Sequence, residues 1–135
     1  MNTLTHIIVN ASISLPLKYA FGWDWSNVLI FVIAGGILID IDHLLFFMFK
    51  HKSINPKRWV LIGKKMRGKM QPGLYIFHSP EFNILLLSLS FFSEIVLIIF
   101  LSNLIHVILD IVEHYKYHGN FLWMKSWSII YSLTH

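Results

Sequence analysis

The chain has 135 residues, of which 56% are hydrophobic and 13% are charged, against about 45–50% and about 25% in soluble domains. A soluble protein of this length would expose much of its surface to water, and it would need more charged side chains on that surface than this chain has. The absence of cysteine excludes disulfides and thiolate metal sites, so any metal must be bound by nitrogen and oxygen. The sequence therefore predicts one integral membrane domain over residues 1–135.

Two hydrophobic helices are predicted in the first fifty residues. The first covers 3–21, and Pro16 is expected to kink it or to end its regular part. No basic segment precedes this helix, so we expect no cleavable signal peptide and a first helix that stays in the mature protein. The second covers 25–50, which is long enough to span about 30 Å at about 1.5 Å per residue. Gly35-Gly36 would let a neighbouring helix approach its backbone closely.

A polar and basic loop follows at residues 51–80. Eight of the eleven Lys and Arg residues lie from Lys50 to Lys69, which is typical of a cytoplasmic loop that also contacts anionic lipid headgroups. Nucleic-acid binding is the alternative interpretation of this cluster. The hydrophobic flanks favour the membrane, so we expect no nucleic-acid partner. A short amphipathic surface helix is predicted near 57–68.

The apolar block at residues 81–116 is too long for a single span and predicts a helical hairpin. We expect a third helix at 81–93 and a fourth at 95–116, with the turn near Ser93-Glu94. A turn at Ser102-Asn103 is the alternative.

Gly119-Asn120 breaks the chain again, and aromatic residues follow it. Trp123, Trp127 and Tyr131 are amphipathic and suit a helix at the membrane interface. The predicted fold class is therefore all-α. It is a bundle of about four membrane-embedded helices with a short basic surface helix and a C-terminal interfacial helix.

The basic loop also fixes the orientation of the helices in the cell membrane. If it is cytoplasmic, four separate stretches of a multi-pass chain carry His and carboxylate groups to the same cytoplasmic depth. Within one helix, His106 and Asp110 are i,i+4 neighbours and Asp40 and His43 are i,i+3 neighbours, so each pair shares a face. Asp42 should point elsewhere unless its helix is distorted.

A charged carboxylate at membrane depth costs several kcal/mol, on the order of 2.5–3.5 kcal/mol at the helix centre, unless it is paired or coordinated. His and carboxylate without Cys suit a borderline or hard divalent cation such as Zn, Mn, Fe or Mg. We expect Zn, with Mn as the alternative, and Asp42 as a general base. A hydrogen-bonded structural cluster is the other interpretation of these groups. The predicted metal ligands are His6, Asp40, Asp42, His43, His78, Glu81, His106 and Asp110.

Four segments, in order, resemble the YdjM-like family of predicted membrane-bound metal-dependent hydrolases: GGILIDIDH, FHSPEF, SNLIHVILD and HGNFLW. The resemblance runs from His6 to about Trp127. The resemblance implicates seven of the predicted ligands: His6, Asp40, Asp42, His43, His78, His106 and Asp110. Glu81 would substitute for a His that the family has before its His-Ser segment. It also implies distant similarity to zinc-dependent phospholipases C and single-strand nucleases. Ile39 stands where the family usually has Pro.

Three functions remain open from the sequence. The first is a metal-dependent hydrolase that acts on a phosphoester such as a phospholipid headgroup, with water activated by the metal. The second is a membrane protein that binds or transports a divalent cation or protons, because intramembrane carboxylates and His also serve that role. The third is a structural or signalling protein whose polar cluster is a hydrogen-bonded core.

Overall fold

The computed structural model describes residues 3–52, 55, 75–119, 121, 125 and 127–134, and the secondary structure of this part is helical. The all-α prediction is confirmed for these residues. The predicted surface helix near 57–68 and most of the basic loop lie outside them. The elements are α1 (Thr3–Phe21), α2 (Trp25–Ile33), the π-helix η1 (Ala34–Leu38), α3 (Ile41–His51), α5 (Pro80–Ser90), α6 (Glu94–His118) and α7 (Ile129–Thr134).

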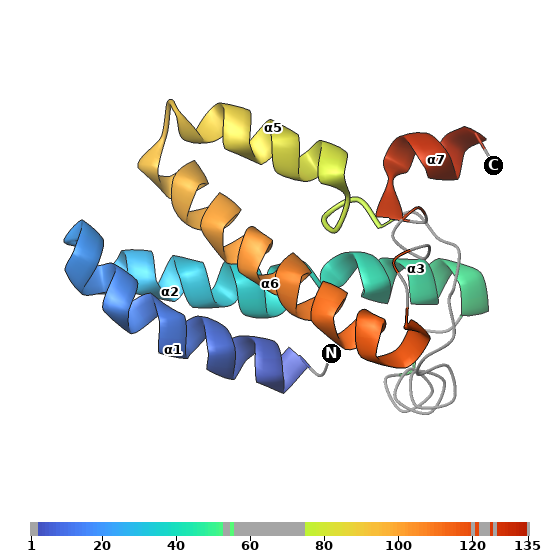
Figure 1. The fold of residues 1–135 in the computed structure, drawn as a ribbon, viewed down its shortest axis with the longest axis horizontal. Helices are drawn as coiled ribbons and strands as arrows, with labels where there is room; N and C mark the ends of the chain where they lie inside the picture. Colours follow the sequence, from blue (N-terminus) through green and yellow to red (C-terminus); the bar gives the residue numbers. More distant parts are fainter. Residues whose placement is uncertain are drawn as a thin grey trace.

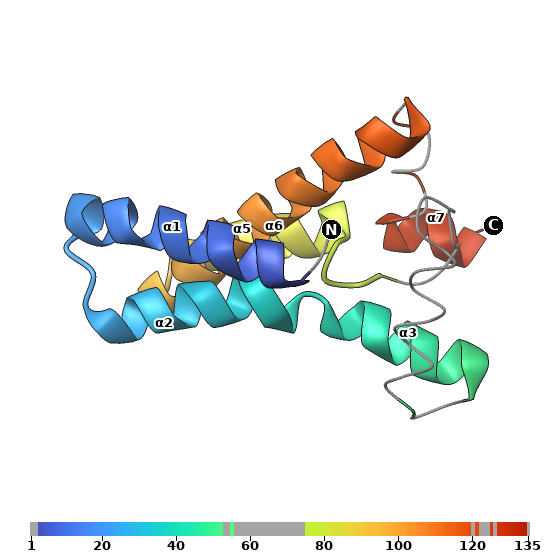
Figure 2. The same cartoon turned by 90° about the horizontal axis from the view of Figure 1, so that it is seen from below.

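The first helix has the predicted bounds and contains Pro16 without ending there. It lies beside α2 and runs in the opposite direction, and α6 crosses both of them (Figures 1 and 2). The turn between α1 and α2 contains Gly22 at φ +67°, a conformation that glycine adopts without the penalty of a Cβ. Asp24 then caps α2 by accepting a hydrogen bond from the Asn27 N–H at 2.9 Å. Trp23, Phe31 and Ile98 form the apolar core at this end.

The second predicted helix, 25–50, is not a single regular helix. Residues Ala34–Leu38 form η1, a turn follows at Ile39 and Asp40, and α3 starts at Ile41. A π-helix inserts an extra residue into a helical turn and rotates the side chains that follow. This is the distortion that lets Asp40 and Asp42 approach the same site, although they are only two residues apart.

The predicted helical hairpin is confirmed, with its turn close to Ser93-Glu94. α5 ends at Ser90, Phe91 and Phe92 form the turn, and α6 begins at Glu94. A turn at Ser102-Asn103 is wrong, because both residues lie inside α6 and are buried. At its other end, α5 begins with Pro80 behind Ser79, whose Oγ accepts a hydrogen bond from the Phe82 N–H at 3.0 Å.

Two segments of the described chain are long and apolar enough to cross a membrane. They are Trp25–Lys50, with mean hydropathy 2.2, and Glu94–Lys116, with mean hydropathy 2.6. In each segment an apolar stretch of 18 residues meets this criterion, and only 39% and 33% of these two stretches are buried within the bundle, so most of each stretch lies at its surface. The 11 residues of α5 extend about 16 Å, which is near half of an approximately 30 Å hydrocarbon layer. The described helices therefore include two candidate spans, and the predicted four membrane-spanning helices are not shown.

Gly35 is the position where helix packing leaves no room for a side chain. A Cβ there would collide with Ser102 Oγ and would lie 2.7 Å from both Ser102 O and Asn10 Oδ1. We predict that Gly35→Ala lowers the free energy of unfolding of the protein in detergent by about 1–3 kcal/mol, and with it the melting temperature. The loss is expected although alanine is favoured over glycine in a helix by about 1 kcal/mol.

Adding Ser102→Ala should restore only part of this stability, because the backbone oxygen of Ser102 remains. Ser88→Ala, on an exposed face of α5, is the control and should leave the melting temperature unchanged. An unchanged melting temperature in Gly35→Ala would contradict this close approach of η1 and α6.

Candidate metal centre

The described helices bring seven of the eight predicted site residues together where α6 crosses the start of α1 and the end of η1. His6 comes from α1, His78 from the turn before α5, and His106 and Asp110 from α6. The remaining three are Asp40, Asp42 and His43, around the start of α3. The fold thus brings these side chains close together, and two groups of them have the geometry to hold a metal ion.

The first group consists of His6, His106 and Asp110, all buried. One ligand atom from each lies within 4.8 Å of the other two. His6 Nε2 is 3.1 Å from Asp110 Oδ1, and the imidazoles of His6 and His106 stack at 3.7 Å with an interplanar angle of 11°. Two nitrogens and a carboxylate from two helices thus face one point.

The second group consists of Asp40, His43 and His78, whose ligand atoms also lie within 4.8 Å of one another. His78 is fully buried, whereas Asp40 and His43 are half-buried. The rings of His43 and His78 are 4.5 Å apart. This group is therefore the more accessible side of the site.

The two groups are adjacent and connected through Asp110 and His106. Asp110 Oδ2 is 3.3 Å from His78 Nε2 and 3.4 Å from His106 Nε2. His106 Nε2 is in turn 3.5 Å from Asp40 Oδ1. A single carboxylate thus lies between imidazoles of both groups, so the groups form one continuous site.

Backbone and carboxylate partners orient two of the imidazoles. His78 Nδ1 is 3.0 Å from Asp42 Oδ2, which also accepts a hydrogen bond from the Phe77 N–H at 3.1 Å. His106 Nδ1 contacts the carbonyl oxygen of Gly35 in η1. If each Nδ1 donates its proton to these oxygens, each Nε2 presents a lone pair to the centre, as in metal-binding histidines held by a second partner.

Several buried polar atoms of the site have no hydrogen-bond partner among the described residues. They are His6 Nδ1, His78 Nε2, His106 Nε2 and Asp42 Oδ1. A buried polar atom without a partner costs about 1–3 kcal/mol, so a cluster of them needs an explanation. A bound divalent cation fits it, because the set consists of imidazole nitrogens and carboxylate oxygens with no sulfur.

The pKa of His78 reflects this environment. Burial alone would lower it, but the nearby carboxylates of Asp110 and Asp42 raise it above its ordinary value. Tyr75 lies 4.6 Å from the His43 ring, and burial raises its pKa to about 12, with Asp42 adding to the effect. Tyr75 therefore stays a neutral phenol at the edge of the site.

The structure places Glu81 away from both groups. Its carboxylate accepts hydrogen bonds from Ser128 Oγ and from the N–H groups of Ile129 and Ile130, at the start of α7. A carboxylate is favoured there because the first N–H groups of a helix lack helical partners. Glu81 thus holds the C-terminal helix on α5.

Sequence reasoning missed two aromatic residues around the site. Trp127, expected as an interface anchor, is buried with its ring 5.5 Å from that of His78 and 5.7 Å from that of His114. Tyr75 packs with Trp127 in the same core. Trp127 has no spacing signal that links it to His78, because it lies far along the chain and contacts His78 only through the fold.

No family model, curated protein or solved structure matches this chain.

The position of Glu81 leads to a test that separates it from the site. We predict that Glu81→Gln leaves the metal content of the purified protein unchanged, because its carboxylate binds α7. The same substitution should speed hydrogen exchange of the α7 amides, since a neutral side chain holds the helix start more weakly. Loss of metal together with unchanged exchange would show that Glu81 belongs to the ligands after all. Glu94→Gln, at the start of α6, is the matched control and should change neither.

Proposed function

We propose that this chain is a membrane-bound, metal-dependent hydrolase that acts on a phosphoester such as a phospholipid headgroup. One observation carries the proposal. Two His/Asp groups that can hold metal share Asp110, and imidazole nitrogens without hydrogen-bond partners face this carboxylate. The resemblance to the YdjM-like family points in the same direction.

The apolar exterior supports a location in the bilayer. Two segments have the length and hydropathy of spans, and exposed Leu, Ile and Phe side chains cover much of the described surface. Large exposed apolar areas mark membrane or protein contacts. The Lys/Arg cluster from Lys50 to Lys69 would place the site on the cytoplasmic side and concentrate anionic lipid there.

The chain supplies the ligands and a separate carboxylate. A bound Zn or Mn would lower the pKa of a water to about 7 and stabilise negative charge on a phosphoester oxygen. His6, His106, Asp110, Asp40, His43 and His78 would hold the cation or cations. Asp42 has one oxygen on His78 and Phe77 and the other, Oδ1, without a partner. It would orient His78 through Oδ2 and accept a proton from water at Oδ1.

Cation or proton transport is the alternative function, and one feature bears on it. Buried polar side chains continue from the site along α1 and α6, through Asn10, Ser14 and Ser102. Beyond these residues, toward the turn between α1 and α2, the core consists of Trp23, Phe31 and Ile98. A path for ions across the membrane needs polar groups at every depth, so this apolar core favours a site that opens to one side.

Metal binding is the first test. We predict that protein purified in detergent retains a divalent cation and that His106→Ala loses most of it, because His106 Nε2 faces both Asp110 and Asp40. His114→Ala is the matched control, since His114 is on the same helix but packs against Trp127. Elemental analysis of all three proteins gives the result. Metal content that is the same in wild type and His106→Ala would overturn the metal site.

The role of Asp42 is the second test. We predict that Asp42→Asn keeps the metal and lowers phosphodiester turnover by about 10²–10⁴-fold, the range for loss of a general base. The asparagine can still accept the Phe77 N–H, so the loop before α5 should stay in place. Loss of metal in Asp42→Asn would instead make Asp42 a ligand. Turnover equal to that of the wild type would remove Asp42 from the mechanism.

A further inference from the structure

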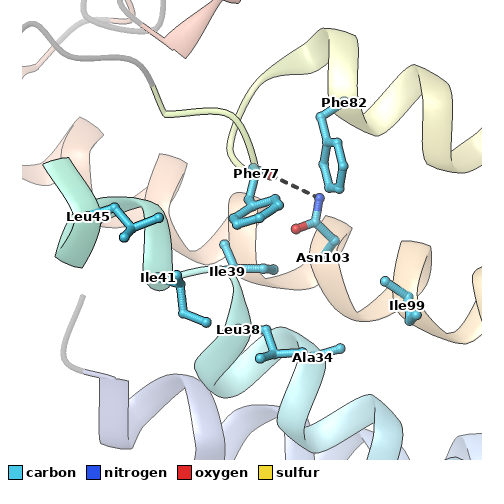
Figure 3. A pocket seen from close by; sticks show the side chains of 9 residues that line it. All are labelled: Ala34, Leu38, Ile39, Ile41, Leu45, Phe77, Phe82, Ile99 and Asn103. Carbon is cyan, nitrogen blue, oxygen red and sulfur yellow. Dashed lines mark hydrogen bonds between the residues drawn. The ribbon is translucent and has the colours of Figure 1, made fainter.

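An apolar pocket of about 280 Å³ lies beside the candidate metal centre, between η1, α3, the turn before α5, and α6 (Figure 3). Its lining is apolar apart from Asn103. Two of its lining residues, Leu38 and Leu45, are 48% and 43% exposed, so the pocket opens to the apolar exterior of the bundle. A ligand could therefore enter from the bilayer.

The pocket and the metal centre share a peptide segment. The N–H of Phe77 donates to Asp42 Oδ2 at 3.1 Å, and the carbonyl oxygen of Phe77 accepts from Asn103 Nδ2 at 3.2 Å. Phe77 also directly precedes His78, and Ile39 and Ile41 of the lining flank Asp40. A molecule in the pocket would thus have one end next to the His/Asp groups.

Asn103 gives the pocket a specific polar feature. Its side chain is 1% exposed, and its amide nitrogen donates to both Phe77 O and Asn83 Oδ1. Its oxygen, Oδ1, is buried and has no hydrogen-bond partner in the part of the chain that the structure describes. Figure 3 shows this oxygen pointing among the apolar lining side chains, toward the ring of Phe77. An amide oxygen can only accept, so the missing partner must be a hydrogen-bond donor.

The size of the pocket limits the apolar part of the ligand. Small-molecule sites usually have about 300–1,000 Å³, so the volume of this pocket, about 280 Å³, is just below that range and favours one chain over two. The pocket contains no described charged side chain, so the charged headgroup must lie outside it, toward the His/Asp groups.

We propose that the pocket binds the single acyl chain of a bilayer lipid whose free hydroxyl group donates to Asn103 Oδ1, while its phosphoester lies at the metal centre. The substrate class is then a monoacyl lipid with a hydroxyl next to its phosphoester. The inference rests on the proposed function for the role of the phosphoester, but the pocket itself can be tested without turnover.

The test uses two photoreactive probes that carry no phosphoester. One is dodecanol with a diazirine at the far end of its chain, and the other is its methyl ether, which cannot donate a hydrogen bond. The full-length protein in detergent is irradiated with each probe, and labelled peptides are identified by mass spectrometry. We expect the alcohol to label pocket peptides about two- to tenfold more than the ether, the range for one hydrogen bond.

Two neighbouring leucines provide the blocking variant and its control. Leu45→Trp should fill the pocket mouth and remove most of the labelling. Leu44→Trp, at a position that is 37% exposed and outside the lining, should leave labelling unchanged. Equal labelling by alcohol and ether, or labelling that Leu45→Trp does not reduce, would overturn the inference. Metal content measured on the same samples reports separately on the proposed function.

Discussion

The carboxylate of Asp110 lies almost fully buried among three imidazoles, those of His6, His78 and His106. Removing a carboxylate from water costs several kcal/mol unless charges or hydrogen bonds compensate for it. The three imidazoles belong to α1, to the turn before α5 and to α6 itself. Satisfying this one carboxylate therefore requires the three segments to meet at one place. A bound cation would strengthen the same constraint, because it would use the nitrogens that now lack partners.

The π-helix η1 makes that meeting possible on the side of α2 and α3. It brings Gly35 close enough to α6 for its carbonyl oxygen to contact His106 Nδ1. It also turns the chain so that Asp40 and Asp42 both reach the site, one beside His106 and the other on His78. π-Helical turns are rare in proteins, and those that do occur are often found at functional sites. Here the irregular turn orients one imidazole directly and places the carboxylate that orients another.

The proposed chemistry and the proposed lipid pocket meet at the backbone of Phe77. Its N–H positions Asp42, and its carbonyl oxygen holds Asn103. A lipid with its chain in the pocket would therefore have its headgroup positioned relative to the metal centre by a single segment that borders both sites. Positioning of this kind can account for a large part of a catalytic rate, because it removes the entropy of bringing the reacting groups together.

The sequence by itself determined the helical class, the bounds of α1, a hairpin turn close to Ser93-Glu94 and the convergence of the His and Asp residues. Apolar blocks, turn residues and i,i+4 spacing are local signals, and buried charges need partners wherever they are. The tertiary structure alone decided the π-helix, the binding of α7 by Glu81 and the burial of Trp127 against His78. Those features depend on contacts between residues far apart in the chain, and helical spacing carries information only about neighbours within a turn or two. A carboxylate such as Glu81 satisfies a metal or a helix start equally well by its chemistry, so only its distance to each in the folded chain could decide between them.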